Sequence, residues 1–406
     1  MTCLRLFIVT ACLIGGVAAD WPQFLGPQRD GTSPEKGLLD TWPAAGPAVV
    51  WQREVGEGYA SPVVADGRLV LFHRVGNEEV IECLTAEGGK PVWKQSYRTD
   101  YSDDLGKGDG PRSTPVVAAD RVFTLGAAGR LTCLDFKTGK ELWAKPLQQL
   151  YEVRKGFFGV GTSPLVEGKA VLVNVGGQGA GIVAFAVDSG KELWKATDHE
   201  ASYASPIAAT IAGDRLALFF TREGLVGVEV ASGAVRFSQR WRARLHASVN
   251  AASPVLLDSD KLFLSACYGT GAGLWKLKRD SAEQLWKNGD ALSCHFSTPV
   301  AQGDLLIGFD GRQEEGARLR AIDWKTGKVR WSEEGYGCGS LVRADGKLFV
   351  MTEDGRLVLG VADANEFRVR SKAQVLTGPV RAHLALANGL LYGRDDRKLV
   401  CWKVKP

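Results

Sequence analysis

Leu134–Trp143 reads LDFKTGKELW, and the chain returns to this phrase several times. VDSGKELW ends at Trp194, and a looser form, LTAEGGKPVW, ends at Trp93. IDWKTGKVRW closes a further copy at Trp331. A phrase that recurs at a nearly fixed spacing is typical of repeat architectures, in which each repeat is one supersecondary unit.

Each repeat begins with a Ser-Pro or Thr-Pro step, as in YASPVVADGRLVLF and RSTPVVAADRVFTL. Two looser copies, CGSLVRADGKLFVMT around Ser340 and RAHLALANGLLYG around His383, continue the series to eight units. The prolines of the six regular steps are Pro62, Pro115, Pro164, Pro206, Pro254 and Pro299, which are 53, 49, 42, 48 and 45 residues apart.

Within a unit the pattern predicts four short strands. An apolar run follows the Ser-Pro step, and turns such as Asp66-Gly67 and Thr138-Gly139 separate it from three further alternating stretches. Glycine supplies the positive φ that tight hairpins need. Four antiparallel strands per unit, repeated around an axis, predict an all-β fold, an eight-bladed β-propeller. The closing tryptophan then lies on the outermost strand, where it covers the seam between blades.

The two ends of the chain are expected to meet in one blade. The last unit ends at KLVCWKVKP and lacks a fourth strand, whereas AVVWQREV, from Ala48 to Val55, precedes the first Ser-Pro step. Joining them makes Trp51 the tryptophan of the eighth blade and leaves no open edge inside the ring. The propeller is therefore expected to cover residues 48–406. The seventh unit, with ADANEFRVRS, has no tryptophan.

The phrases LDFKTGKELW and SPVVADGR resemble the repeat of the PQQ-like (quinoprotein-type) propeller superfamily. This superfamily includes quinoprotein alcohol dehydrogenases and the outer-membrane assembly factor BamB, as well as uncharacterised secreted relatives. The resemblance covers about Ala48 to Pro406. It implies the propeller fold, and the assembly-factor branch is the nearest functional analogy.

The segment before the propeller contains two regions. Residues 1–19, with Arg5 as their only charge and an apolar run from Leu6 to Ala19, predict a cleavable signal peptide. The run is too short for a transmembrane span. A lipoprotein signal ending at Cys12 is a weaker alternative. Residues 20–47 are rich in proline and glycine and predict an extended strap on the propeller surface. We therefore expect a periplasmic or secreted protein.

The charge pattern gives no reason to expect a nucleic-acid partner. The formal net charge is +4, with acidic and basic residues mixed along the chain. We expect a monomer whose partner is an envelope protein or an extended peptide, with a small ligand as an alternative.

The cysteines are expected to be packing residues and not reactive groups. Cys83, Cys133 and Cys401 occupy a column that holds alanine or glycine in other units, which predicts buried thiols used as small apolar side chains. No C-x-x-C motif occurs. Cys294 and Cys338 lie near the starts of neighbouring units, and whether they form a disulfide stays open.

No catalytic or metal-binding motif is evident. The histidines lack metal-ligand spacing, and the acidic loop DYSDDLGKGDG, from Asp100 to Gly110, lacks the calcium-loop pattern and is expected to be solvated. By resemblance, quinoprotein enzymes use an aspartate base, calcium and often two adjacent bonded cysteines. This chain has no adjacent cysteines. We therefore expect neither an enzyme nor a bound cofactor, and PQQ is not favoured.

Residues just before each Ser-Pro step are expected to line the mouth of the central channel. They combine arginines with aromatic side chains, which suits an extended peptide or an anionic ligand. We expect a binding or scaffolding module, with a small PQQ-dependent oxidoreductase or a carbohydrate-binding propeller as alternatives. The candidate binding residues are Tyr59, Arg112, Tyr203, His295, Phe296 and Arg381.

Overall fold

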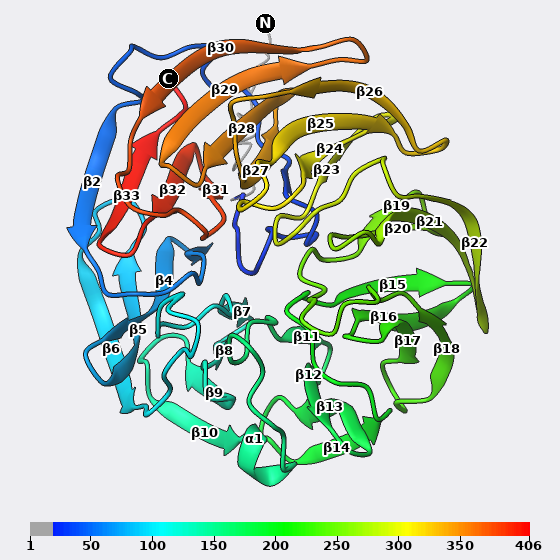
Figure 1. The fold of residues 1–406 in the computed structure, drawn as a ribbon. Coiled ribbons are helices and arrows are strands. Elements are labelled where there is room, and N and C mark those ends of the chain that lie inside the picture. Colours follow the sequence, from blue (N-terminus) through cyan, green and yellow to red (C-terminus); the bar gives the residue numbers. More distant parts are fainter. Residues whose placement is uncertain (1–18) are drawn as a thin grey trace, which may run out of the picture.

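The computed structural model describes residues 19–406, which form a ring of eight antiparallel sheets around a central axis (Figure 1). Every sheet contains four sequential strands, apart from the sheet that joins the two ends of the chain and one sheet that gains a fifth strand. The predicted eight-bladed β-propeller is confirmed. The expected signal peptide falls on residues that lie, except for Ala19, outside the described part of the chain.

The first four blades follow the chain in order, and one short helix, α1 (Leu147–Leu150), follows blade 2. Blade 1 contains β3 (Val63–Ala65), β4 (Arg68–Val75), β5 (Glu78–Thr85) and β6 (Pro91–Arg98). Blade 2 contains β7 (Val116–Ala118), β8 (Arg121–Leu125), β9 (Arg130–Asp135) and β10 (Glu141–Pro146). Blade 3 contains β11 (Leu165–Glu167), β12 (Ala170–Gly177), β13 (Ala180–Ala186) and β14 (Glu192–Ala196). Blade 4 contains β15 (Ile207–Ile211), β16 (Asp214–Phe220), β17 (Gly224–Glu229) and β18 (Val235–Arg240).

The last four blades complete the ring, and strands from the N-terminal segment join two of them. Blade 5 contains β19 (Val255–Leu257), β20 (Lys261–Ala266), β21 (Gly271–Lys278) and β22 (Ser281–Asn288). Blade 6 contains β23 (Val300–Gln302), β24 (Leu305–Asp310), β25 (Arg318–Asp323) and β26 (Lys328–Glu333). Blade 7 contains β27 (Gly339–Ala344), β28 (Lys347–Thr352), β29 (Arg356–Ala362) and β30 (Phe367–Gln374), with β1 (Thr32–Ser33) as its fifth strand. Blade 8 contains β31 (Ala385–Ala387), β32 (Leu390–Arg394), β33 (Lys398–Lys403) and β2 (Val49–Glu54).

The ring closes as the sequence predicts. Strand β2 pairs antiparallel with β33, and Trp51 lies directly opposite Cys401. The Trp51 indole N–H donates to the backbone oxygen of Ala86 in blade 1, 2.8 Å away. The first and last strands of the propeller therefore share one sheet, and this sheet is tied to the next blade.

The repeated tryptophan docks onto the Thr-Gly turn of the following blade. Trp93 of blade 1 donates its indole N–H to the Phe136 oxygen of blade 2 at 2.9 Å. Its ring lies against Gly139, where an added Cβ would sit only 2.5 Å from ring atoms. Gly139 also has a φ of +74°, so the turn requires glycine both for its backbone conformation and for the space that the ring occupies. The same indole bond to the next blade is made by Trp143, Trp194, Trp286 and Trp331.

Blade 7, which lacks this tryptophan, receives one from the N-terminal segment. In blade 2, Trp143 packs on Phe123 of its own sheet with ring centroids 5.9 Å apart. In blade 7 the position matching Trp143 is Ser371, whose hydroxyl accepts a hydrogen bond from the Trp42 backbone N–H at 2.9 Å. The Trp42 ring stacks on Phe349 at 6.3 Å and is 8% exposed. Trp42 thus supplies from outside the repeat the aromatic side chain that the blade itself lacks.

The Ser-Pro steps form a belt of hydrogen bonds around the axis. The backbone N–H of the serine or threonine in one blade donates to the hydroxyl of its counterpart in the next. The following proline has no N–H that would need a partner inside the ring. His383, the counterpart in blade 8, donates its backbone N–H to Ser61 in blade 1 at 2.8 Å. The belt joins Ser61, Thr114, Ser163, Ser205, Ser253 and Thr298 through bonds of 2.9–3.1 Å.

The belt is interrupted at blade 7, where the N-terminal segment enters the ring. Within the described residues the Ser340 hydroxyl has no hydrogen-bond partner. At this blade, β1 adds to the inner edge of β27 in parallel, with Thr32 opposite Arg343. The Arg343 N–H donates to the Gly31 oxygen at 2.9 Å. The segment therefore supplies backbone contacts at the inner edge of the blade where the side-chain belt is broken.

The first part of the N-terminal segment, which includes Trp21 and Arg29, lies inside the ring, whereas residues 38–42 run over blades 7 and 8. Trp21 pairs with Val64 of blade 1 and is 1% exposed. Arg29 is buried and donates to the backbone oxygens of Pro164 and Pro206, in blades 3 and 4. Burial lowers the pKa of Arg29 to about 9. Free carbonyl groups on the inner strands are the physical reason: they give an extended chain more partners inside the ring than it finds outside.

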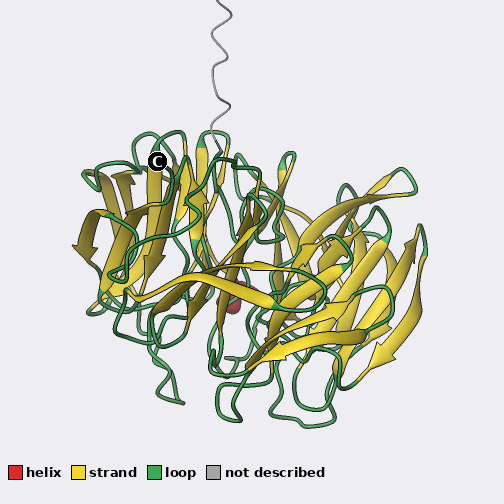
Figure 2. Ribbon diagram, turned by 90° about the horizontal axis from the view of Figure 1, so that it is seen from above, coloured by secondary structure: helices red, strands yellow, loops and turns green. Residues whose placement is uncertain are grey.

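The two faces of the ring differ. The C-terminus lies on the face where the N-terminal segment enters (Figure 2). On this face the Leu39 N–H donates to the Val404 oxygen at 2.8 Å, and Glu35 accepts from the Gly389 N–H. The long loops that connect one blade to the next lie on the opposite face. Across residues 19–406, we find no helix with the length and hydropathy of a membrane span.

Replacing Trp42 tests the borrowed side chain. We expect Trp42→Ala to lower the free energy of unfolding by about 3–5 kcal/mol, because it leaves a cavity over Phe349. Trp42→Phe should lose less than half of this amount, since the indole N–H has no partner among the described residues. Urea unfolding followed by fluorescence measures both variants. Equal stability of Trp42→Ala and the parent protein would contradict the packing role.

Removing one hydroxyl tests the belt. Ser253→Ala leaves the buried Ser205 N–H without an acceptor, which should cost about 1–3 kcal/mol of unfolding free energy. Ser340→Ala is the matched control: it removes the same atoms at the same position of blade 7, where the hydroxyl bonds to none of the described residues. We expect its cost to stay below about 0.5 kcal/mol. Similar losses for the two variants in urea unfolding would argue against the belt.

Candidate functional site

The axial channel is open on the face of the long blade-to-blade loops, where it forms a cavity of about 280 Å³. The N-terminal segment fills the other half of the channel, and Phe24 from this segment forms part of the cavity floor. All six candidate residues from the sequence lie around this one cavity. They are Tyr59, Arg112, Tyr203, His295, Phe296 and Arg381.

One wall is a cluster of tyrosine and arginine. The Arg381 guanidinium lies over the Tyr59 ring, 5.1 Å from its centroid, and donates to the Tyr59 hydroxyl at 3.2 Å. Glu353 holds the Arg381 Nε at 2.7 Å. The Arg112 guanidinium also lies over Tyr59, at 5.5 Å. Burial raises the pKa of Tyr59, although Arg381 acts in the opposite direction, so the phenol stays neutral.

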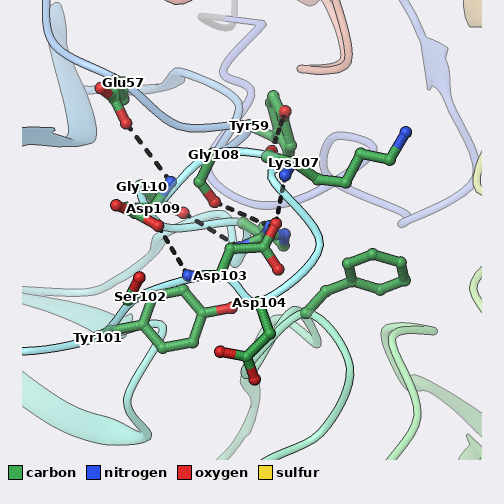
Figure 3. A network of polar contacts seen from close by, with 12 residues as sticks. Glu57, Tyr59, Tyr101, Ser102, Asp103, Asp104, Lys107, Gly108, Asp109 and Gly110 are labelled. Atoms are coloured by element: carbon green, nitrogen blue, oxygen red, sulfur yellow. Dashed lines mark hydrogen bonds and ion pairs between the residues drawn. The ribbon is translucent and has the colours of Figure 1, made fainter.

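The loop between blades 1 and 2 folds over this cluster and is internally bonded (Figure 3). Asp109 accepts from the Asp103 N–H at 2.7 Å, and Asp103 in turn accepts from the Lys107 N–H. The Asp103 side chain is fully buried, 3.6 Å from the Arg112 guanidinium. The expectation that this acidic loop is solvated is wrong for Asp103, because its carboxylate is needed to satisfy donors of the loop itself.

A second wall is aromatic. Phe158, from the loop between blades 2 and 3, meets Tyr203 edge-to-face with ring centroids 5.6 Å apart. The Tyr203 hydroxyl accepts the Phe158 backbone N–H at 2.8 Å. Arg112 lies over the Phe158 ring at 5.8 Å. The aromatic wall is thus held in place by the same arginine that contacts Tyr59.

The third wall contains a neutral histidine. The Tyr268 hydroxyl is 2.9 Å from His295 Nε2, and the Gln313 side-chain oxygen is 2.8 Å from His295 Nδ1. Burial lowers the pKa of His295. A neutral imidazole fits both contacts when Nδ1–H donates to Gln313 and Nε2 accepts from Tyr268. Arg312 lies over the Tyr268 ring at 4.9 Å.

The floor is apolar and includes a histidine with an unsatisfied nitrogen. His383 is 4% exposed and meets Phe24 edge-to-face at 4.9 Å. Burial lowers its pKa to about 4, so the ring is neutral at pH 7. Among the described residues, no group hydrogen-bonds to His383 Nδ1. A buried polar atom without a partner is costly unless a ligand or water satisfies it.

Several lining residues escaped the sequence analysis. Phe158 follows Phe157 just before a Ser-Pro step, and this aromatic pair was a usable signal. Phe24 gave none, because the sequence does not show that its segment enters the channel. The remaining missed residues come from turns inside blades 5 and 6, from the loop over the first wall and from the loop between blades 4 and 5. They include Lys107, Ala247, Val249, Tyr268, Arg312, Gln313 and Glu314.

The cysteines in the described part of the chain form no disulfide with one another. All six described cysteines are buried free thiols, as predicted for Cys83, Cys133 and Cys401. Cys294 and Cys338 are free as well, and burial raises the pKa of both thiols.

The residues around the cavity fit the quinone cofactor of the superfamily poorly. Within residues 19–406 there is no cluster of three histidine, cysteine or carboxylate side chains suited to a metal ion. Glu314 is the one carboxylate among the residues that line the cavity. A bound calcium prefers six to eight oxygen ligands, several of them carboxylates. We therefore derive no redox step at this site.

Comparisons with known proteins agree with this architecture. A family model described as outer membrane protein assembly factor BamB matches residues 76–333 and 238–405. BamB of Burkholderia pseudomallei (strain K96243) is 26% identical over 236 residues, which are 56% of this chain and 55% of that protein. Quinohemoprotein alcohol dehydrogenase ADH IIB of Pseudomonas putida is 30% identical over 146 residues, which are 34% of this chain and 19% of that enzyme. The chain thus spans about half or less of the length of these two relatives.

A solved structure shows the same fold. The crystal structure of BamB from Moraxella catarrhalis superposes with a TM-score of 0.65 at 16% sequence identity. The superposition covers 88% of this chain and 98% of that one.

The buried histidine at the floor predicts a loss of stability in mild acid. Its pKa in the folded protein, about 4, is below the ordinary value of 6.5, so the unfolded chain takes up the proton first as the pH falls. The contribution of the neutral His383 to the unfolding free energy is complete above pH 6.5 and is lost as the pH falls toward 4. Between pH 6.5 and 5, the parent protein should lose about 2 kcal/mol of unfolding free energy through His383. His383→Gln should not show this loss. Parallel pH profiles for the two proteins in urea unfolding would contradict this prediction.

Proposed function

The chain belongs to the family of outer membrane protein assembly factor BamB, and we propose that it is a protein-binding scaffold in the cell envelope. The observation that carries this proposal is the family match, which spans 76–405 and hence nearly the whole ring. The relatives of this family are named for the assembly of outer-membrane proteins. We propose the same role here, with protein partners on the periplasmic side.

Exposed apolar side chains on the loop face support a role in docking a protein partner. Exposed leucines occur on loops between blades: Leu105 is 53% exposed and Leu245 is 54% exposed. Both loops lie beside the axial cavity, to which Lys107 and Ala247 contribute. Apolar side chains on loops held by a rigid scaffold are typical of protein-binding surfaces.

We propose further that the protein carries out no reaction. Several polar side chains around the cavity bond to other side chains: Arg381 donates to Glu353, and the Gln313 side-chain oxygen is within hydrogen-bond distance of His295. The Ser163 and Ser205 hydroxyls accept backbone N–H groups of the belt. This arrangement fixes the shape of a binding surface, whereas a nucleophile would need a neighbouring base.

Carbohydrate binding is supported less well than protein binding. Sugar rings stack on free aromatic faces. Two guanidinium groups already lie over Tyr59, and Tyr203 packs against Phe158.

Site-specific crosslinking tests the scaffold role. We expect benzoylphenylalanine at position 105 or 245 to crosslink, in intact cells, to outer-membrane β-barrel proteins or to their assembly machinery, identified by mass spectrometry. Position 92, an exposed valine on the outer strand β6, is the control for nonspecific capture.

The proposal fails if neither loop position enriches an outer-membrane protein above the position 92 control. Binding of PQQ with calcium to the purified protein, together with dye-linked alcohol oxidation, would favour the enzymatic alternative instead.

A further inference from the structure

A second pocket adjoins the axial cavity. This pocket, of about 780 Å³, lies between blade 8 and the loop that joins blades 1 and 2. The two spaces share Tyr59, Lys107 and Arg381 in their walls. We call the two adjoining spaces the axial trough; at their junction the Tyr59 hydroxyl accepts from Arg381 and donates to the Lys107 backbone oxygen. An elongated space of this kind suits a chain better than a compact molecule.

The walls of the axial cavity carry more positive than negative charge. Arg112, Arg312 and Arg381 line it, and the carboxylates that pair with Arg112 and Arg381 lie behind these guanidinium groups. The side chain of Asp103 is fully buried, and Glu353 does not line the cavity.

Lys107 adds a further positive charge at the junction of the two spaces. Within the described residues its amino group takes part in no ion pair or hydrogen bond, and Figure 3 shows its side chain extending away from the loop. A cation that projects into a trough without a carboxylate partner favours an anionic ligand.

The inner end of the trough, which is the axial cavity, suits an apolar side chain with a polar edge. Phe24, Phe158 and Phe296 line the cavity around its floor. His383 Nδ1, buried at the floor, lacks a hydrogen-bond partner among the described residues. A ligand group entering the cavity would therefore meet aromatic rings and the edge of the His383 imidazole that faces the cavity.

The outer part of the trough is lined partly by main chain. Its walls contain five glycines, together with Tyr59 and the charged side chains of Lys107, Arg381, Arg397, Glu57 and Asp396. At the glycines, backbone groups are accessible to another backbone, as in the recognition of extended peptides. The glycines are Gly58, Gly106, Gly108, Gly110 and Gly378.

The other half of the channel already holds a segment of this chain, which pairs with inner strands at Trp21 and at β1 and forms turns between them. Trp21 pairs with Val64, and the Pro22 oxygen accepts the Val117 N–H at 2.8 Å. Phe24 then reaches the cavity floor. The inner strands of the ring therefore exchange backbone hydrogen bonds with another stretch of polypeptide.

We propose that the axial trough binds an extended acidic segment of a partner polypeptide. One aromatic or large apolar side chain enters the axial cavity and reaches His383. Neighbouring carboxylates meet Lys107, Arg112 and Arg381, and the main chain runs outward past the glycines. This inference rests on the proposed scaffold function and adds to it the site and the chemistry of the ligand.

Calorimetric titration of the full-length mature protein tests the assignment. The probe is a blocked hexapeptide of alternating glutamate and phenylalanine. We expect it to bind at least about tenfold more tightly than the same peptide with glutamine or lysine in place of glutamate. A peptide of alternating glutamate and alanine, which lacks the anchor, should also bind at least about tenfold more weakly.

Two variants locate the site. Lys107→Gln removes the projecting charge without breaking an ion pair among the described residues, and it should raise Kd about tenfold. Lys278→Gln is the matched control, because Lys278 pairs with Glu283 at 2.9 Å on the exposed β21–β22 hairpin of blade 5. It should leave Kd unchanged. Arg381→Gln should weaken binding at least as much as Lys107→Gln.

Three results would overturn the assignment: equal affinity for the glutamate and glutamine peptides, equal Kd for Lys107→Gln and Lys278→Gln, or phenylacetate binding as tightly as the hexapeptide. The last result would mean a small-molecule site. The proposed function is tested separately: crosslinks to outer-membrane proteins without peptide binding would reject the trough and retain the scaffold. Absence of those crosslinks would reject the scaffold itself.

Discussion

A four-stranded sheet has two faces, and in this protein each face can be buried only against another blade. Every seam must therefore be closed for the ring to be stable. Two sets of contacts do this at different radii. Near the axis, the Ser-Pro hydroxyls accept the backbone N–H of the preceding blade. At the rim, an indole such as that of Trp93 covers the glycine turn of the following blade. Both contacts join different blades, so the stability of one blade depends on its neighbours.

The blade with the poorest repeat shows how strict this requirement is. Blade 7 has Ser371 where others have tryptophan, and its Ser340 lies where the inner belt is broken. The N-terminal segment compensates at both radii, with β1 on the inner edge and Trp42 at the rim. The same segment closes half of the channel and leaves the other half as a cavity. The cavity on the loop face is thus a by-product of how the N-terminal segment completes blade 7.

Local patterns were enough to predict most of this architecture. The spacing of the prolines defined the blades, and the missing fourth strand of the last unit predicted that Trp51 lies beside Cys401. Residues before the Ser-Pro steps were placed correctly around the channel, because strand order alone fixes which positions face the axis. The path of residues 20–47 was not predictable, since the segment has no periodicity and bonds to backbone groups of several blades. Phe24 at the cavity floor was missed for this reason. The burial of Asp103 was missed because it depends on how its own loop folds around the carboxylate.

The course of the N-terminal segment also affects how the protein folds during synthesis. Trp42 and β2 are made early, yet their partners in blades 7 and 8, Phe349 and Cys401, are made last. Until the ribosome has completed the chain, these residues have nothing to pack against, and the face of blade 1 that packs on blade 8 remains exposed. Contacts that span almost the whole sequence form slowly. The nascent protein therefore passes through a long interval in which hydrophobic strands are exposed, a state that invites aggregation and calls for a chaperone until the ring is complete.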